Sequence, residues 1–423
     1  MRVCLFEEQA EFLDPLSLTR PVFHLVCGRT CLGWKQLRYW APREYGLMVR
    51  RHLEDLTRNG NAGLPVNDLN WLRAGTTVLV NGRWLPPEGS PRLLQTPCVG
   101  LAGGEVAFAV VGPGETDKLS PELLPSFLDE WQNTLPSQPA GGVMVRFPWD
   151  LVEQNGTQLR RDFAATPCAA SAPPANLALV GSAENLWVDP EARVDPYVVA
   201  DTTQGPVMID AHAVVASFSR LEGPCYVGPY TQVHGANIRA GTTLGPQCRV
   251  GGEIEASIIH GHSNKYHEGF LGHSYVGEWV NLGAGTHNSD LRNDYGEVTV
   301  TIHGKPTATE QSKVGCFLGD HTKTGLGTLL NTGTSVGAFC NLLPAGRLAP
   351  KYVPSFTNLW NGSLREGFDM DQLLTTARQV MQRRGRQLTD PQEALYHWLR
   401  QETAAERRRV LRASEQRELR RSA

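Results

Sequence analysis

Through the middle of the chain, aliphatic residues recur at every sixth position. The first series, with a slip of one residue before Ile238, consists of Ile209, Val215, Leu221, Val227, Val233, Ile238, Leu244 and Val250. The spacing returns at Val276 and Leu282 and later at Leu318, Leu330, Val336 and Leu342, with Thr324 in the remaining slot. A period of six fits neither an α-helix nor the two-residue alternation of a strand. It is typical of a parallel β-helix, in which each repeat forms one face of a coil and its aliphatic residue points inward.

Glycine follows this pattern, as in Val227-Gly228 and Leu244-Gly245, and is expected to serve the corners of the coil because it tolerates tight turns. Residues 1–175 hold 16 glycines, residues 176–361 hold 24, and the last 62 residues hold 3. The shift predicts three regions: an α/β domain over 1–175, a β-helix over 176–362 and a helical tail over 363–423.

The first region alternates short apolar runs with helical patterns. The runs of strand length are Val3–Phe6, Gly46–Val49, Thr76–Val80 and Val106–Val111. The helical patterns are Cys31–Trp40, Pro121–Trp131 and Pro148–Phe163. Such alternation predicts a Rossmann-like, mainly parallel sheet flanked by helices, with ligands at the carboxyl ends of the strands. The tail is expected to form two helices, Met370–Arg383 and Pro391–Arg420.

The charge is nearly balanced, with 40 basic and 43 acidic residues, which argues against a nucleic-acid or membrane-surface protein. The tail, residues 363–423, has 13 arginines and 9 acidic residues, so its net charge is +4 and that of residues 1–362 is −7. The charged run Glu406–Arg409 is interpreted as a solvent-exposed helix face. No apolar run reaches the ~18 residues that span a bilayer, and the start has no signal-peptide design. Nine cysteines without a CxxC pair favour free thiols and a cytoplasmic location.

The most specific motif lies within the second region, where His267-Glu268-Gly269-Phe270-Leu271-Gly272 leads into Val280-Asn281-Leu282-Gly283-Ala284-Gly285-Thr286. Without a gap, this string resembles the acetyltransferase half of the bifunctional UDP-N-acetylglucosamine pyrophosphorylase/glucosamine-1-phosphate acetyltransferases. That family implies a left-handed β-helix, acetyl-CoA as co-substrate and a homotrimer. The resemblance places a general base at His267, a substrate-stacking ring at Phe270, substrate contacts at Asn281 and Glu253, and a coenzyme contact at Ala284.

These residue types suit acyl transfer to an amine. Neutral imidazole titrates near the working pH and accepts the amine proton, while an amide such as Asn281 or backbone N–H groups hold the developing oxyanion. Two alternatives stay open: His267 is a corner histidine of the coil, or His273, which falls on an aspartate of the family, is the base.

The sequence departs from the family at the expected phosphate-binding cations, which fall on His234 and Glu255. Lys265, Arg239 and Arg249 are the candidates to replace them. The stretch 287–296 is longer than the corresponding loop of the family. Asn293 and Asp294 match its coenzyme-contacting pair best, although an Asn/Asp/Gly cluster is also typical of an exposed turn.

Near the start, Asp14-Pro15-Leu16-Ser17-Leu18-Thr19-Arg20-Pro21 is similar to a string of the divergent sugar nucleotidyltransferases, and the usual Gly-rich loop is absent. The resemblance extends to about residue 360. It implies a phosphate contact at Arg20, since a guanidinium forks onto phosphate oxygens. The other nucleotide-site candidates are Lys35, which would pair with the same group, Asn81, Arg83 and Asp150. Asn81 stands where the family holds Mg²⁺ with an aspartate, and Asp150 would supply the missing charge.

Three functions compete at this point. The first is a two-activity enzyme that acetylates glucosamine-1-phosphate and then couples the product to UTP. The second is a nucleotidyltransferase alone, using UTP or dTTP with another sugar-1-phosphate, with the β-helix as scaffold. The third is a non-catalytic sugar-nucleotide-binding or trimer-assembly protein.

Overall fold

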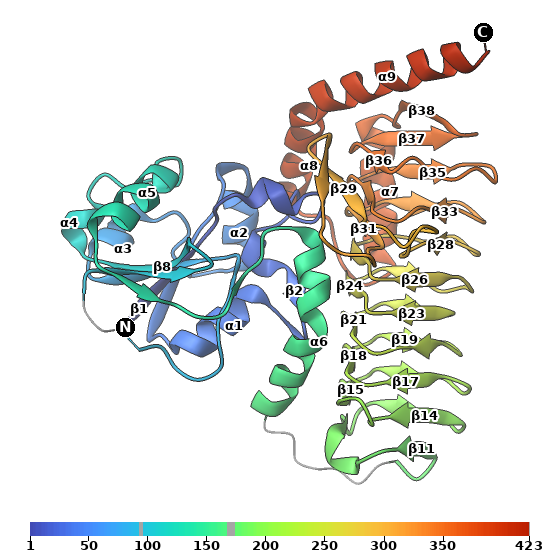
Figure 1. The fold of residues 1–423 in the computed structure, drawn as a ribbon, viewed down its shortest axis with the longest axis horizontal. Coiled ribbons are helices and arrows are strands. Elements are labelled where there is room, and N and C mark those ends of the chain that lie inside the picture. Colours follow the sequence, from blue (N-terminus) through green and yellow to red (C-terminus); the bar gives the residue numbers. More distant parts are fainter. Residues whose placement is uncertain (93–95, 167–173, 423) are drawn as a thin grey trace.

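The computed structural model describes residues 1–92, 96–166 and 174–422. An α/β domain lies beside a tall column of stacked strands, and helices from the end of the chain lie against both (Figure 1). The three regions expected from the sequence thus appear in the expected order.

The sheet of the first domain has six strands in the order β4-β1-β5-β8-β7-β9. Their bounds are β4 (Glu44–Met48), β1 (Arg2–Phe6), β5 (Thr77–Asn81), β8 (Glu105–Val111), β7 (Cys98–Ala102) and β9 (Ser137–Pro139). The strands β4, β1 and β5 are parallel, whereas β8 runs antiparallel to both β5 and β7. Because β9 is parallel to β7, five of the six strands run in one direction and β8 alone is reversed, so the expectation of a mainly parallel sheet is confirmed. Gly103 and Gly104, both with positive φ, close a two-residue hairpin between β7 and β8, and a hairpin makes its strands antiparallel.

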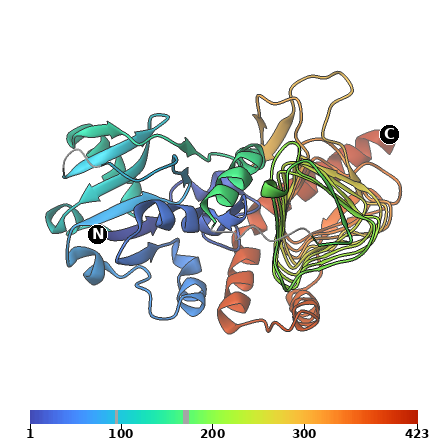
Figure 2. The same cartoon turned by 90° about the horizontal axis from the view of Figure 1, so that it is seen from below.

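Helices and short elements surround this sheet. The helices are α1 (Leu32–Trp40), α2 (Glu54–Gly60), α3 (Leu69–Arg73), α4 (Pro113–Thr116), α5 (Leu124–Thr134) and α6 (Pro148–Ala165). Two small sheets pair β2 (Val26–Cys27) with β3 (Thr30–Cys31) and β6 (Trp84–Leu85) with β10 (Val143–Met144). Helix α6 lies between the sheet domain and the column (Figure 2).

The column is a parallel β-helix with three faces. Face 1 stacks β11 (Leu177–Val180), β14 (Val198–Asp201), β17 (Arg220–Glu222), β20 (Asn237–Ile238), β23 (Glu253–Glu255) and β26 (Phe270–Gly272). Face 2 stacks β12 (Leu186–Val188), β15 (Val207–Ile209), β18 (Cys225–Val227), β21 (Thr242–Leu244), β24 (Ile258–Gly261), β27 (Tyr275–Glu278), β31 (Cys316–Leu318), β34 (Thr334–Val336) and β36 (Tyr352–Val353).

Face 3 begins with β13 (Arg193–Val194), β16 (Val214–Val215), β19 (Gln232–Val233), β22 (Arg249–Val250) and β25 (Asn264–Lys265). Bridges from Asn264 through Asn281 to Lys323 continue it to β32 (Lys323–Thr324), β35 (Asn341–Leu343), β37 (Thr357–Trp360) and β38 (Ser363–Glu366). The strand β38 pairs with β37, so this sheet continues past the expected boundary at 362. The six-residue series forms the interior as predicted, since Ile209, Val233 and Leu342 are fully buried.

Residues other than glycine occupy one edge of the coil, the corner between faces 2 and 3. His262, Trp279, His321, Phe339 and Phe356 all have positive φ there, although the sequence predicted glycine at the corners. Their rings stack in a ladder, with 4.4 Å between the centroids of His262 and Trp279 and 5.1 Å between those of Phe339 and Phe356. We attribute the strained backbone conformation to this stacking, which offsets its cost.

Between β27 and β31 the chain contributes Asn281 to face 3 and then, beyond residue 288, leaves the coil. It forms β28 (His287–Asn288), which pairs with β33 (Leu329–Leu330), and a hairpin of β29 (Thr299–Ile302) and β30 (Lys305–Ala308). Val298, Val300 and Ile302 of this excursion are buried in one cluster with Leu13 and Trp149 of the first domain. The excursion therefore joins the β-helix to the sheet domain.

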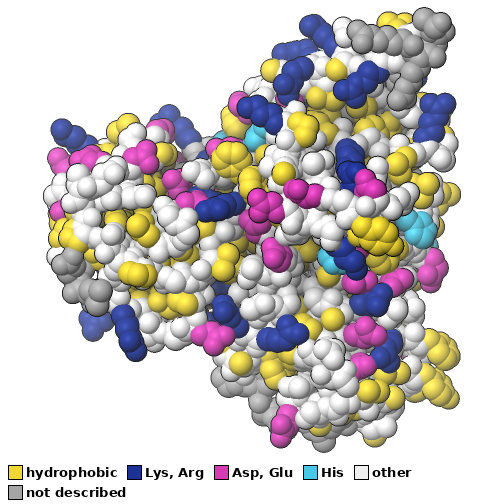
Figure 3. Space-filling view, in the orientation of Figure 1, with side chains coloured by type: hydrophobic (Ala, Val, Ile, Leu, Met, Phe, Trp, Pro, Cys, Tyr) yellow, Lys and Arg dark blue, Asp and Glu magenta, His cyan; other side chains and the backbone are white. Residues whose placement is uncertain are grey.

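The tail forms three helices, α7 (Met370–Gln382), α8 (Asp390–Glu402) and α9 (Ala404–Ser422). The single helix expected over 391–420 is divided at Thr403, whose backbone N–H still caps α8. Arg407, almost fully buried, donates to Glu366, and this contact directs α9 across the top of the coil. Lys and Arg side chains gather over this end of the molecule, in keeping with the basic tail (Figure 3).

Candidate functional site

His267 lies in the turn that joins β25 on face 3 to β26 on face 1. Its side chain is exposed, and its ring meets the edge of Tyr266 at 5.1 Å between centroids. In the part of the chain that the structure describes, no side chain hydrogen-bonds the imidazole. The ring nitrogens are therefore available to a ligand.

Lys265 is buried beneath this turn. It occupies the slot of face 3 that Val250 and Leu282 fill in the neighbouring coils, and only 3% of its surface is exposed. Its ammonium donates to the carbonyl oxygens of Gly251 (3.0 Å) and His267 (2.6 Å), and burial lowers its pKa to about 8. The structure thus places Lys265 as a support of the His267 turn, not as a cation presented to a sugar phosphate.

The other β-helix candidates are distributed over two faces. Ala284 lies next to the His267 turn, since the N–H of Gly285 donates to the carbonyl of Glu268 at 3.0 Å. Asn281 is on face 3, where its Oδ1 accepts from Asn264 at 3.1 Å. Phe270 lies half-buried on face 1, over Gly272, where a Cβ would collide with the ring.

The charged candidates differ in whether a carboxylate neutralises them. Arg239 is paired with both Glu253 (3.1 Å) and Glu255 (3.0 Å), so Glu253 is not an isolated carboxylate. Arg249 donates only to the carbonyl oxygens of Tyr230 and Cys248. Of the three cations considered for a phosphate, Arg249 is the one that is neither buried nor neutralised.

Asn293 and Asp294 lie in an exposed turn that follows β28. Asp294 accepts from Arg292 at 2.7 Å, and this hydrogen bond holds the pKa of its carboxyl well below the usual value. Among the described residues, no hydrogen bond or ion pair joins this turn to His267. The expected coenzyme contact is thus not assembled within the single chain.

A histidine–carboxylate pair lies at the other end of β26, and the sequence showed no sign of the pairing. Nδ1 of His273 is 2.7 Å from Oδ2 of Asp290, across 17 residues of sequence. Burial raises the pKa of Asp290, but the hydrogen bond and charge of His273 outweigh it and lower the pKa. A base oriented by a carboxylate is a common catalytic arrangement, so His273 stays the competing candidate.

At the sheet domain, the predicted phosphate cations are engaged elsewhere. Arg20 forms a buried ion pair with Asp320 of the β-helix and lies 3.3 Å from Glu278, while Thr19 donates to Asp320 at 2.7 Å. Burial raises the pKa of Glu278, but Arg20 and His260 outweigh it and hold the pKa well below its usual value. The segment 14–21 therefore holds the sheet domain against the β-helix through the contacts of Thr19 and Arg20 with Asp320.

Lys35 pairs with Asp162, so the structure does not bring it to the same group as Arg20. Asp162 also accepts from Arg38 at 3.1 Å and from the N–H of Arg29 at 2.8 Å. Asp150 accepts from the N–H groups of Arg146 and Phe147 and caps the start of α6. Each of these contacts holds secondary structure in place.

Asn81 and Arg83 do come together, at the carboxyl ends of β1 and β5. Asn81 is fully buried and donates to Glu8 at 2.8 Å, while Arg83 pairs with Glu8 (3.3 Å) and Glu105 (2.7 Å). Mg²⁺ prefers carboxylates together with substrate phosphates. The set fits Mg²⁺ poorly, because Arg83 already pairs with both carboxylates and Arg146 also pairs with Glu105. No group of three or more His, Cys, Asp or Glu side chains suited to a metal occurs in residues 1–92, 96–166 and 174–422.

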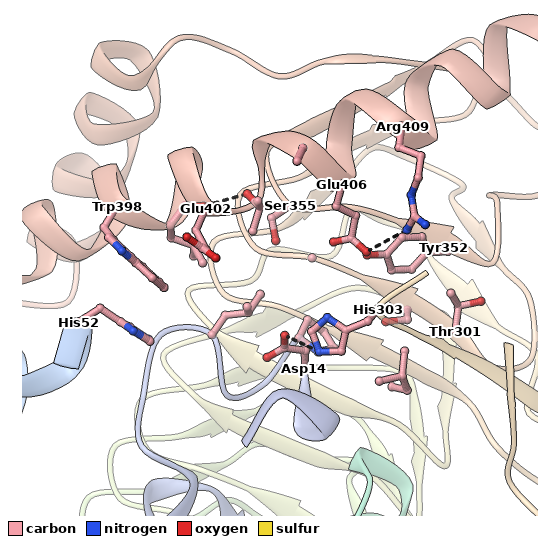
Figure 4. Close-up of a pocket in the computed structure, with 18 of the residues that line it drawn as sticks. Asp14, His52, Thr301, His303, Tyr352, Ser355, Trp398, Glu402, Glu406 and Arg409 are labelled. Atoms are coloured by element: carbon pink, nitrogen blue, oxygen red, sulfur yellow. Dashed lines mark hydrogen bonds and ion pairs between the residues drawn. The ribbon is translucent and has the colours of Figure 1, made fainter. Parts of the chain in front are cut away.

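A cavity of about 540 Å³, the junction pocket, lies where the sheet domain, the β29–β30 hairpin, face 2 and the C-terminal helices meet. Asp14, from the string that also holds Arg20, points into it toward His303, 3.5 Å away (Figure 4). His52 stacks on Trp398 with 3.8 Å between ring centroids. Burial raises the pKa of Asp14 to about 6, against the opposing effects of Ser17, His303 and Arg50.

The raised pKa of Asp14 predicts a pH-dependent stability. The folded chain keeps the Asp14 proton between about pH 4 and pH 6, where the unfolded chain has lost it, so the free energy of unfolding falls as pH rises through this window. The expected loss is on the order of 2 kcal/mol. Urea unfolding of Asp14→Asn is expected to lack this slope, whereas the exposed Asp117→Asn keeps it. An unchanged slope in Asp14→Asn would contradict the assignment.

Comparisons with known proteins agree with this architecture. Residues 3–167 match the family model described as sugar nucleotidyl transferase. The bifunctional sugar-1-phosphate nucleotidylyltransferase/acetyltransferase of Sulfurisphaera tokodaii is 34% identical over 109 residues, covering 25% of this chain and 27% of that protein. The bifunctional protein GlmU of Heliobacterium modesticaldum is 30% identical over 163 residues, covering 37% of this chain and 32% of its own.

Among solved structures, the UDP-N-acetylglucosamine acyltransferase of Francisella novicida is 10% identical, with a TM-score of 0.29, and covers 48% of this chain and 72% of that one. The chain spans about a quarter to a third of the length of the two curated relatives.

The part of the chain that matches the sugar nucleotidyl transferase model is thus joined to a parallel β-helix. Segments of the chain are similar to parts of bifunctional GlmU-like proteins. No helix in the described part of the chain is both long and apolar enough to cross a bilayer.

Proposed function

We propose that the β-helix transfers an acetyl group from acetyl-CoA to the amine of glucosamine-1-phosphate, with His267 as the general base. The observation that carries the proposal is the exposed imidazole of His267, which no side chain of the described residues hydrogen-bonds and whose turn is supported by Lys265. A base must reach the amine proton while the nitrogen attacks the thioester carbonyl. A fixed turn with a free ring meets this requirement.

Uridylyl transfer by the sheet domain, giving UDP-N-acetylglucosamine, is the second part of the proposal. The family match over residues 3–167 favours it. Arg20, Lys35 and Arg83 are paired with carboxylates, so a nucleoside triphosphate would have to displace these contacts. A nucleotidyltransferase that uses another sugar-1-phosphate, with the β-helix as scaffold, is the alternative.

One experiment separates these functions. The chain is incubated with MgCl₂ and with acetyl-CoA, UTP, dTTP and a mixture of sugar-1-phosphates, and the products are identified by mass spectrometry. Acetylated sugar phosphate and a UDP-sugar together support the two-activity enzyme. Pyrophosphate release without acetyl transfer supports the nucleotidyltransferase alone, and ligand binding without any product supports the non-catalytic alternative.

We further propose a homotrimer, in which the exposed face 1 lies near a neighbouring copy. Face 2 is covered by the sheet domain, because Ile258, Tyr275 and Phe317 are buried in the interdomain cluster. Asn293 and Asp294, which do not meet His267 within one chain, would then contact a coenzyme held between copies. Light scattering coupled to size exclusion tests this assembly, and a monomer at assay concentration would contradict it.

A further inference from the structure

A small cavity lies between face 3 and the end of α7, and its lining contains basic side chains but no acidic ones. This pocket, the α7 pocket, has a volume of about 210 Å³. The residues that line it are His262, Asn264, Trp279, Val280, Asn281, Lys323, Val380, Arg383 and Arg384. The lining holds three cations, one histidine and two amides, and it contains no carboxylate.

Lys323 and Arg384 donate only to neutral acceptors, and Arg383 makes no hydrogen bond among the described residues. Lys323 donates to the carbonyl of His321 at 3.0 Å, and burial alone lowers its pKa to about 8. Arg384 donates to Oδ1 of Asn264 at 2.7 Å and to the carbonyl of Gln247 at 3.3 Å. In the described part of the chain, no carboxylate lies within ion-pair distance of Lys323, Arg383 or Arg384.

Several buried cations elsewhere in the molecule are paired with carboxylates, although Lys265 is held by two carbonyl oxygens. Arg20 is paired with Asp320, Lys35 with Asp162 and Arg83 with Glu105, as expected because an uncompensated buried charge is costly. In the α7 pocket the positive charges instead repel one another. Burial, together with the charges of Arg249 and Arg383, lowers the pKa of Arg384. Among the described residues, the cluster thus lacks a carboxylate at ion-pair distance.

We propose that the α7 pocket binds the phosphate group of a ligand. A phosphate carries up to two negative charges and accepts several hydrogen bonds, which matches two guanidinium groups at the end of α7 and an ammonium of β32 in one pocket lining. Asn281 adds an amide whose Oδ1 is already used, so its N–H groups face the ligand as donors. Nδ1 of His262, buried and without a partner, is a further polar contact.

The site does not depend on which group the chain transfers. Its position nevertheless fits the proposed function, since Asn264 lines the pocket only three residues before His267. It lies on face 3, away from the ion-paired Arg239 and Glu253 of face 1. The helical tail, which the sequence left without a role, supplies two of the three cations.

Binding to the full chain is tested by calorimetric titration with inorganic phosphate, glucosamine-1-phosphate and CoA. Arg383→Gln is the principal variant, because its exposed side chain makes no hydrogen bond or ion pair among the described residues and the fold does not depend on it. Lys323→Gln is the second variant. Arg386→Gln, a nearby exposed arginine outside the lining, is the matched control.

We expect Arg383→Gln and Lys323→Gln each to bind at least one probe at least about tenfold more weakly than the parent chain. The control Arg386→Gln should bind as the parent chain does. The melting temperature of unliganded Lys323→Gln should equal or exceed that of the parent, because a repulsive charge is removed, and its rise on adding phosphate should be lost. The probe whose binding is weakened identifies the ligand that carries the phosphate. CoA indicates the acetyl donor, glucosamine-1-phosphate indicates the acetyl acceptor, and inorganic phosphate alone indicates a free phosphate ion.

No binding of any probe, or equal weakening in Arg386→Gln, would overturn the phosphate pocket. Failure of the proposed reaction looks different: the probes would still bind and the variants would still weaken them, while no acetylated product forms. If both variants transfer acetyl groups and bind the probes as the parent chain does, the phosphate pocket is contradicted while the proposed reaction is supported.

Discussion

His267→Ala is expected to lower the rate of acetyl-CoA-dependent acetylation of glucosamine-1-phosphate by about 100- to 10,000-fold, the range that a positioned general base contributes. The loss should fall on kcat, because the imidazole moves a proton and does not anchor the sugar. CoA release followed by a thiol reagent measures it. The free energy of unfolding should change little, since the ring is exposed and without hydrogen-bond partners among the described residues.

His273→Ala is the matched comparison, because both histidines flank the same strand, β26. It removes the pair with Asp290 and should cost stability while leaving most of the transfer rate. The reverse result, full activity in His267→Ala and a large loss in His273→Ala, would assign the base to the His273–Asp290 pair. Parent-like rates in both variants would remove both histidines from the chemistry.

Arg20→Ala is expected to destabilise the chain by about 3–5 kcal/mol, because it leaves Asp320 and Glu278 with an uncompensated buried charge. Both Arg20 and Asp320 are almost fully buried between the domains. Urea unfolding measures the change. The loss should appear where the sheet domain separates from the β-helix, so the transition is also expected to become broader or biphasic.

A double-mutant cycle isolates the interdomain pair. Arg20→Ala combined with Asp320→Ala should cost less than the sum of the two single variants, because neither charge is then left alone. If the losses of unfolding free energy in the two single variants simply add in the double variant, the Arg20–Asp320 pair does not hold the two domains together. Unchanged stability with a large loss of UTP binding would instead restore the phosphate contact that the sequence predicted for Arg20.

The architecture was largely predictable from the sequence, because it depends on local periodicity. One aliphatic residue per six positions is enough to specify a coil, and Thr324 filled its slot as expected, in register with Leu342. The aliphatic series is interrupted between Val250 and Val276, although the predicted coil continues there. Lys265 occupies an inward slot there, and no hydropathy pattern shows a lysine whose ammonium is satisfied by two backbone carbonyls.

The site was predictable only in part. The turn that carries His267 could be identified because a contiguous string encodes it, and the structure presents the ring to solvent. The partners of Arg20, Lys35 and His273 could not be read, because Asp320, Asp162 and Asp290 lie 300, 127 and 17 residues away in the sequence. A cation looks the same in sequence whether a carboxylate neutralises it or not.

The sequence by itself determined which segments form the β-helix, which alternate strand and helix, and which turn carries the candidate base His267, since these follow from short-range spacing and one contiguous string. Only the tertiary structure decided which charges are used up in holding the domains together and which are left for a ligand. Arg20 is neutralised by packing against the β-helix, whereas Arg383 and Arg384 are brought by α7 to a pocket without carboxylates. Charge compensation is a property of distances in space, and the order of residues along the chain does not contain it.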